Sequence, residues 1–256
     1  METETKINKF SIWKVLSYFI IYSIVGFLIE TAFGVCTKGV LESRKSFLYG
    51  PFCAIYGLGA VTMIYFLQYF KKNNYTLFFG GFLIGSIIEY IISFLGEIIF
   101  NIKWWDYSDK FLNINGRICF TFSLFWGLLA IYLITHFNKL IDKLIDKIKS
   151  KLSGRTLKII ISTISVAIII DAALTCIGLK VFFTRLIENN NLDVAFSEKY
   201  IIKNREIMDS EIINKIFSDK KMLRTFPNLK LTASNGDTIY VDSLLPDIQS
   251  YYIKFK

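Results

Sequence analysis

Long apolar runs separated by short polar segments make up the first two thirds of the chain. A helix needs about 20 apolar residues to cross the roughly 30 Å hydrocarbon core of a bilayer. Five runs reach this length, and they cover residues 10–35, 51–70, 75–100, 118–137 and 157–183. The pattern predicts an all-α polytopic membrane helix bundle of about five transmembrane helices, with residues 1–183 as the transmembrane domain.

The segment between the fourth and fifth runs has a different pattern. In residues 139–152, apolar residues such as Leu140, Leu144 and Ile148 recur at helical spacing, and lysines repeat on the other side. An amphipathic helix of this kind lies in the membrane interface and is attracted to anionic lipid. The alternative is a docking helix for a cytoplasmic partner such as an ATPase.

The last part of the chain, residues 184–256, has the composition of a soluble protein. Residues 210–223 have a helical pattern. Residues 230–245 have the pattern of a hairpin, because Asn235-Gly236 is a strong turn signal between two apolar stretches. We therefore predict a small α+β C-terminal module.

The net charge of +9 sits largely beside the apolar runs and in the tail. Lys and Arg near the span ends number twelve on the N-terminus and the second and fourth loops, against six on the first and third loops. Cytoplasmic segments carry the excess of Lys and Arg, so we expect the N-terminus to be cytoplasmic. The charge follows membrane topology and no nucleic-acid motif accompanies it, so nucleic acid is not a predicted partner.

The first two spans resemble the third and fourth. Each pair has Gly-x-x-x-Glu in its first helix and aromatic-Gly-Leu-x-Ala in its second. The matching residues are Gly26, Glu30, Tyr56 and Gly57 in the first pair and Gly85, Glu89, Trp126 and Gly127 in the second. This predicts a tandem two-helix repeat with both units in the same orientation, related by a pseudo-twofold axis along the membrane normal.

Acidic residues inside the spans are the first candidates for function. An ionisable side chain in a membrane is costly, and it usually faces the bundle interior or a water-filled cavity. Glu30, Glu89 and Asp171 lie within the predicted spans. The alternative for each is a hydrogen bond or ion pair that only fixes helix packing. Glu97 lies nearer a helix end, where its carboxylate could reach the membrane interface. A functional role is therefore less needed to explain its presence.

Polar residues in the first and third loops lie on the same predicted face as one another. Trp and Tyr at span ends are usually interfacial anchors, but that does not explain the acids, amides and arginines beside them. Arg44 and Arg117 could donate to a phosphate or carboxylate. The complete predicted binding set is Glu30, Arg44, Tyr49, Glu89, Trp105, Asp106, Tyr107, Asn113, Asn115, Arg117, Trp126 and Asp171.

Other chemistry finds little support in the sequence. The chain has no Gly-x-x-x-x-Gly-Lys-Ser/Thr loop, so it does not carry the ATPase. His136 lies at a span end, and the four cysteines lack metal-type spacing. No catalytic residues, metal site or cofactor are predicted, and enzyme activity has no sequence signature here.

Several motifs together carry a resemblance to a known family. They are Tyr49 to Gly59, Glu89-Tyr90, Trp104 to Ser108, Asn113 to Cys119 and Ser123 to Gly127. The chain resembles the bacterial putative ABC-transporter type IV (CmpB-like) membrane permease family, strongly over residues 12–140 and more weakly at Asp171 and Phe226-Pro227. Cys53-Ala54 stands where the family pattern has Cys-Pro.

The resemblance implies a multi-pass transporter permease in a bacterial cell membrane, with any ATPase supplied by a partner. On this reading the chain is a permease or substrate-binding subunit for a polar or anionic solute. Two alternatives remain open: a membrane enzyme acting on a lipid headgroup, and a non-catalytic scaffold or accessory protein in which the polar residues only fix the fold.

The predicted topology can be checked directly. With a cytoplasmic N-terminus and five crossings, a tag placed after the last residue lies outside the cell, because an odd number of crossings changes sides. We expect protease added to intact cells to remove such a tag and to leave an N-terminal tag untouched. Protection of the C-terminal tag in intact cells would contradict the five-crossing topology.

Overall fold

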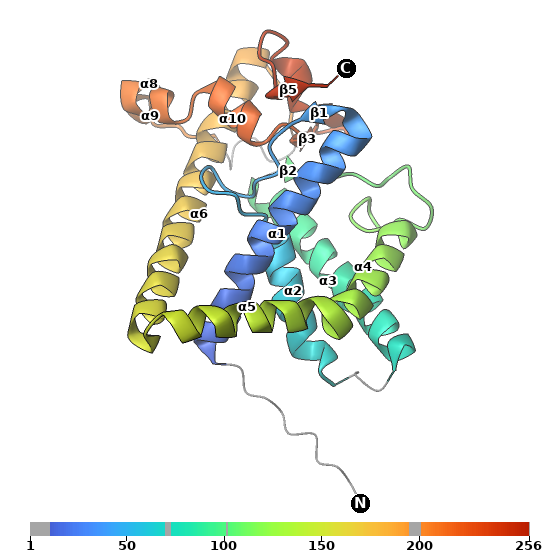
Figure 1. The fold of residues 1–256 in the computed structure, drawn as a ribbon. Coiled ribbons are helices and arrows are strands. Elements are labelled where there is room, and N and C mark those ends of the chain that lie inside the picture. Colours follow the sequence, from blue (N-terminus) through green and yellow to red (C-terminus); the bar gives the residue numbers. More distant parts are fainter. Residues whose placement is uncertain (1–10, 70–72, 101, 195–200, 256) are drawn as a thin grey trace, which may run out of the picture.

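The computed structural model describes residues 11–69, 73–100, 102–194 and 201–255. Its long helices run roughly alongside one another between two faces (Figure 1). Within these described residues, four helical stretches are long and apolar enough to cross a membrane. These are α1 (Ile12–Lys38), α3 (Asn74–Phe100), the stretch Phe120–Lys151 and α6 (Gly154–Asn190). The chain is therefore a multi-pass helical membrane protein, as the apolar runs predicted.

The second apolar run forms a shorter helix than the others. Helix α2 covers Ala54–Leu67, 14 residues, which is about 21 Å at 1.5 Å per residue. The residues before it fold back instead of continuing the helix. Gly50 has a φ of 68°, and the amide of Ser46 donates to the carbonyl of Phe52 at 2.8 Å. Among the described residues, the structure therefore has four helical stretches of spanning length and one shorter apolar helix, α2.

The stretch Phe120–Lys151 changes direction in the middle. Helix α4 (Phe120–Tyr132) runs beside α3, and α5 (Asn138–Lys151) crosses the lower ends of α1 and α2 (Figure 1). A π-helical turn, η1 (Leu133–Phe137), joins them. Helix α5 lies over the segment 139–152, for which the sequence predicts an amphipathic helix.

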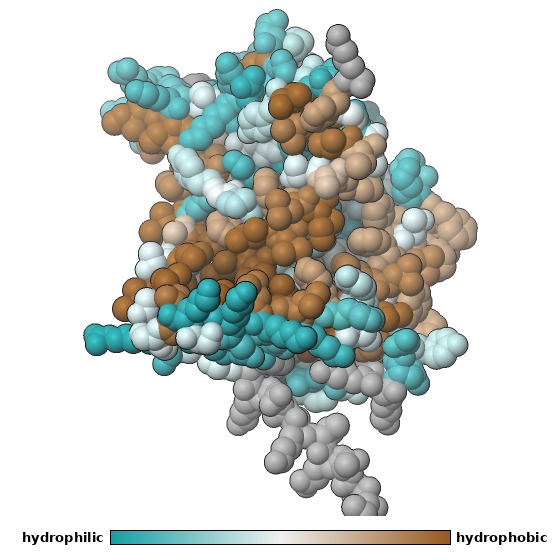
Figure 2. Space-filling model, viewed as in Figure 1, coloured by the Kyte–Doolittle hydropathy of each residue, from teal (hydrophilic) through white to brown (hydrophobic). Residues whose placement is uncertain are grey.

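Side chains of α1 hold α5 in place. Asp142 accepts a hydrogen bond from the Tyr18 hydroxyl and pairs with the Lys14 amine at 2.9 Å. The Tyr22 hydroxyl donates to Oδ1 of Asn138 at 3.1 Å. Figure 2 shows the polar residues of α5 as a band below a broad apolar surface. We call this end of the bundle the N-terminal face.

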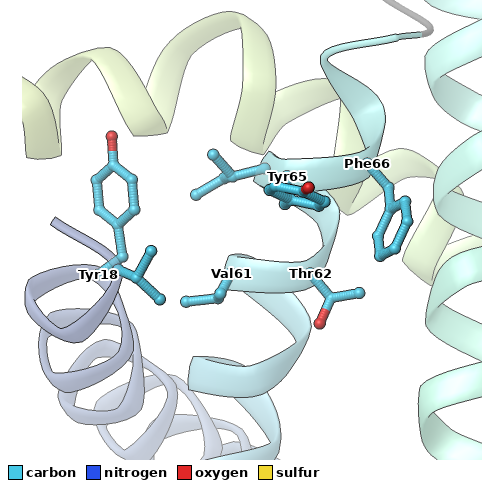
Figure 3. A pocket seen from close by; sticks show the side chains of 7 residues that line it. Tyr18, Val61, Thr62, Tyr65 and Phe66 are labelled. Carbon is cyan, nitrogen blue, oxygen red and sulfur yellow. The ribbon is translucent and has the colours of Figure 1, made fainter. Parts of the chain in front are cut away.

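A cavity of about 190 Å³ lies between α1 and α2 near this face (Figure 3). Tyr18 lines it from α1, and Val61, Thr62, Tyr65 and Phe66 line it from α2. Among the residues that the structure describes, no acidic or basic side chain lines it. The cavity is therefore a poor candidate for a site that selects a charged solute.

Glycines bring the helices of each repeat into close contact. A Cβ atom at Gly26 of α1 would collide with the Tyr56 side chain of α2. A Cβ atom at Gly85 of α3 would collide with Trp126 of α4 in the same way. Small residues allow helix backbones to approach closely in membranes. The equivalent contacts in the two helix pairs agree with the predicted tandem repeat.

The C-terminal part lies at the opposite end of the bundle (Figure 1). Its described residues form three short helices and a hairpin, followed by a 3-10 turn and a last strand. Their bounds are α8 (Arg205–Asp209), α9 (Glu211–Ile216), α10 (Asp219–Thr225), β3 (Lys230–Thr232), β4 (Thr238–Tyr240), η2 (Val241–Leu244) and β5 (Ile253–Lys254). The predicted hairpin is confirmed, with Gly236 at a φ of 90°. The predicted helix at 210–223 is divided into α9 and α10 at Phe217, which packs against Gly178 of α6.

Two membrane-side loops contribute strands to this C-terminal part. Strand β1 (Val40–Leu41), from the loop after α1, pairs antiparallel with β5. Strand β2 (Ile102–Lys103), from the loop after α3, pairs antiparallel with β3. We call this end of the bundle the loop face, and residues 201–255 the tail. One buried hydrophobic cluster joins the tail to the end of α6 and to Leu48 and Ile102 of the two loops.

The strand pairing can be tested by cross-linking. Val40 lies opposite Lys254 in the β1–β5 pair, and Cα atoms across a disulfide are usually about 4.4–6.8 Å apart. We expect the double variant Val40→Cys, Lys254→Cys to form a disulfide under mild oxidation, detected by mass spectrometry of the linked peptides. The control Val40→Cys, Lys230→Cys joins strands of different sheets and should not cross-link. Equal cross-linking in both variants would contradict this pairing.

Candidate functional site

Glu89 is buried between α3, α4 and the loop that joins them, with 4% of its surface exposed. Its Oε1 accepts a hydrogen bond from the Tyr107 hydroxyl at 3.0 Å, and its Oε2 accepts one from Nε1 of Trp126 at 3.1 Å. A buried polar group without partners would cost several kcal/mol in hydrocarbon. Each carboxylate oxygen of Glu89 therefore has a hydrogen-bond donor, and the side chain can remain inside the bundle.

Tyr107 is held as a donor by its surroundings. Burial raises the pKa of the Tyr107 hydroxyl, and the nearby Glu89 carboxylate raises it further. The phenol therefore keeps its proton at physiological pH. Its ring also stacks on Phe122 of α4, with the ring centroids 4.7 Å apart. This contact fixes the loop residue over the start of α4.

Glu30 occupies the equivalent position in the first repeat. Its Oε1 accepts a hydrogen bond from the Tyr56 hydroxyl of α2 at 2.7 Å, and its side chain is half-buried. The rings of Tyr56 and Trp126 contact each other, with centroids 6.1 Å apart and planes inclined by 51°. The acid–aromatic pairs of the two repeats therefore meet. We call Glu30, Tyr56, Glu89, Tyr107 and Trp126 the paired-glutamate centre.

A cavity of about 90 Å³ adjoins this centre. Residues of α1, α2, α4 and η1 line it, and Tyr56 and Trp126 form part of its wall. Gly26 also lines it, and because Gly26 has no side chain, the ring of Tyr56 can lie against it. We call this cavity the groove.

Arg117, in the loop after α3, is committed to interactions with the end of α3. Its guanidinium pairs with Glu97 and lies over the ring of Tyr90, 5.4 Å from the centroid. Its carbonyl oxygen accepts a hydrogen bond from Nε1 of Trp105 at 2.8 Å. Arg117 and Trp105 therefore fasten this loop to the end of α3.

The remaining polar residues of that loop shape its backbone. Asn113 donates to the carbonyls of Ser108 and Lys110 and accepts from the amide of Gly116. Asn115 and Gly116 have φ values of 54° and 65°, as a type I′ turn requires, and Asn115 donates to the Tyr90 hydroxyl. These contacts indicate an ordered loop.

Asp106 joins the same loop to the tail. Its Oδ1 accepts from the amide and hydroxyl of Ser108, and its Oδ2 accepts from the Thr238 hydroxyl at 3.0 Å. Partial burial acts to raise the pKa of Asp106, but these hydrogen bonds and the nearby Lys103 outweigh it and place the pKa below its usual value. The carboxylate is therefore a structural acceptor.

The predicted residues of the first loop also make structural contacts. Arg44 pairs with Glu42 at 2.6 Å and lies against Gly34 of α1. The amide of Tyr49 donates to Asp171 of α6 at 3.0 Å, and the Tyr49 hydroxyl accepts from the Lys221 amine of the tail at 2.8 Å. Asp171 thus anchors the loop to α6 at a distance in sequence of more than a hundred residues.

The structure divides the predicted binding set into two groups. Glu30, Glu89, Tyr107 and Trp126 come together in the centre. The others organise the loop face, namely Arg44, Tyr49, Trp105, Asp106, Asn113, Asn115, Arg117 and Asp171. The predicted set omitted Tyr56, although the repeat pattern marks it as the counterpart of Trp126.

The donor from the loop can be removed without changing the shape of the centre. In Tyr107→Phe the Oε1 atom of Glu89 loses its partner, which costs roughly 1–3 kcal/mol for a buried group. We expect a lower apparent Tm in detergent, by about 2 °C or more. The control Tyr75→Phe removes a hydroxyl from a side chain that is 79% exposed and should leave the Tm unchanged. Equal Tm values for both variants would show that the bond does not stabilise the fold.

The part of the sequence that forms the paired-glutamate centre matches the model of a known family. The model of the family described as putative ABC-transporter type IV matches residues 17–176. This match runs from α1 into α6 and includes every residue of the paired-glutamate centre, and it stops short of the tail. Searches of curated proteins and of solved structures each returned no significant match. Because the family model covers more than half of its length, the chain belongs to the putative ABC-transporter type IV family.

Proposed function

We propose that the chain is the membrane-embedded permease subunit of an ATP-driven transporter, and that a polar solute binds at the paired-glutamate centre. Two facts support the first part. The chain belongs to an ABC-transporter-type family, and it is a multi-pass helical membrane protein. The second part depends on the geometry of the centre.

The observation that carries the proposal is the meeting of two acid–aromatic pairs from the two repeats. Glu30 bonds to Tyr56, Glu89 bonds to Trp126, and the two aromatic rings touch. Ionisable residues inside membrane spans are costly and usually mark solute or ion pathways. Transporters built from repeats commonly bind their substrates where the repeats meet. The centre has both properties.

The charge of the centre favours one kind of solute. Its two acids would attract a cationic group or a hydrogen-bond donor. The arginines that an anion would need, Arg44 and Arg117, already pair with Glu42 and Glu97. Of the polar and anionic solutes expected from the sequence, the geometry therefore supports a polar, donor-rich solute better than an anionic one.

The partners and orientation belong to the same proposal. ATP hydrolysis comes from a separate polypeptide, which meets the N-terminal face on the cytoplasmic side of a bacterial cell membrane. There α5 lies in the lipid interface and presents lysines to the cytoplasm. The tail lies on the outer side, above the loops.

A ligand screen tests the solute site. Purified protein in detergent is heated with small cationic, neutral and anionic solutes, and the Tm is recorded. We expect a cationic or amine-containing solute to raise the Tm, because binding to the folded state stabilises it. Glu30→Gln and Glu89→Gln should abolish this rise. The control Asp146→Asn changes an exposed acid of α5 and should keep it.

Two results would overturn the proposal. One is a rise in Tm that persists unchanged in both glutamine variants, which would place binding elsewhere. The other is the absence of any stabilising solute together with a lower yield of folded protein in both variants. That combination would make the two acids structural and the chain a scaffold.

A further inference from the structure

The groove has a chemical character different from that of the centre beside it. Its wall is formed almost wholly by aliphatic and aromatic side chains, including Val25, Ala60, Met63 and Leu129. Tyr56 and Trp126 belong to both the groove and the paired-glutamate centre. Each presents its ring to the groove and its polar atom to a glutamate. The site therefore joins an apolar slot to two acids.

The groove is too small for a ring. Its volume of about 90 Å³ is below the ~150 Å³ of a dry cavity that accepts benzene, so it holds only a few carbons of a hydrocarbon chain. Its lining residues run from Trp126 of α4 to Phe137 of η1.

The groove opens toward lipid and is bounded by irregular backbone. Ile29 and Tyr132 line it and remain 45% and 55% exposed on the apolar surface. Leu133 and Phe137, at its far end from the glutamates, begin and end the π-helical turn η1. π-Helical turns occur frequently at functional sites. A hydrocarbon chain can thus enter the groove from the bilayer.

We propose that the solute is an amphiphile that carries an amine, with its hydrocarbon chain in the groove and its amine at Glu30 and Glu89. This inference rests on the proposed function and names the substrate class of the same site. Charge complementarity selects the headgroup, since the two acids bond to Tyr56 and Trp126, which form part of the groove wall. The apolar wall selects the chain. A free alkylamine and an ethanolamine phospholipid share this chemistry.

Trp126 makes the proposal measurable, because bromine on a hydrocarbon chain quenches the fluorescence of a tryptophan that it contacts. The changes Trp13→Phe, Trp104→Phe and Trp105→Phe leave Trp126 as the single tryptophan. We expect a long-chain alkylamine with bromines on the carbons nearest the amine to quench Trp126 at a concentration roughly tenfold lower than the equally brominated carboxylate of equal chain length. Glu30→Gln and Glu89→Gln should remove that preference.

A matched pair of variants tests the groove itself. Leu129 lines the groove, whereas its neighbour Leu128 is 61% exposed and does not. We expect Leu129→Phe to fill the slot and weaken quenching by the alkylamine, and Leu128→Phe to leave it unchanged. If the single-tryptophan protein does not fold, the Tm rise caused by the unbrominated alkylamine replaces quenching as the readout in the wild-type background.

The outcomes separate this inference from the proposed function. Equal quenching by amine, alcohol and carboxylate, or no effect of Leu129→Phe, would overturn the amphiphile. If propylamine stabilises the protein as well as the long-chain amine does, and Glu89→Gln abolishes both effects, the polar site stands and the amphiphile fails. If an ethanolamine phospholipid displaces the brominated amine, the natural amphiphile is a lipid. If the brominated amine stays bound in the presence of that phospholipid, the natural amphiphile is a free alkylamine.

Discussion

A carboxylate placed in the apolar interior of a membrane protein must find donors, and this constraint explains much of the bundle. Glu89 takes its two hydrogen bonds from Trp126 of α4 and from Tyr107 of the loop between α3 and α4. Trp126 can lie close enough only because Gly85 has no side chain. The acid, the donors and the glycine therefore depend on one another, and together they fix how α3 and α4 pack.

The same arrangement recurs in the first repeat, with one difference that bears on function. Glu30 has the equivalent donor, Tyr56, and the equivalent glycine, Gly26. Its side chain is half-buried, whereas Glu89 is buried. The first repeat thus offers the more accessible acid, while the second is enclosed by its loop. In the proposed function, this asymmetry would give a solute one acid to approach and one acid already held in position.

The two faces of the bundle are stabilised by different means. On the N-terminal face, Lys14, Tyr18 and Asp142 fasten the amphipathic helix α5 across α1. On the loop face, two strands from the loops pair with strands of the tail, and a shared apolar core closes the contact. Movement of either repeat at the loop face would have to be accommodated by this strand pairing, because backbone hydrogen bonds connect each loop to the same tail.

The sequence alone predicted most of the helices, the amphipathic α5 and the β3–β4 hairpin, because these follow from local periodicity and turn chemistry. Its short repeated motifs predicted the tandem repeat, with which the glycine contacts agree. It also identified Glu30 and Glu89, since an acid in an apolar run stands out without a structure. The tertiary structure decided which polar residues share a site. Arg117 pairs with Glu97 twenty residues away, and Tyr49 bonds to Asp171 across the bundle. Such partners depend on how helices and loops pack in space, and spacing along the chain does not encode that.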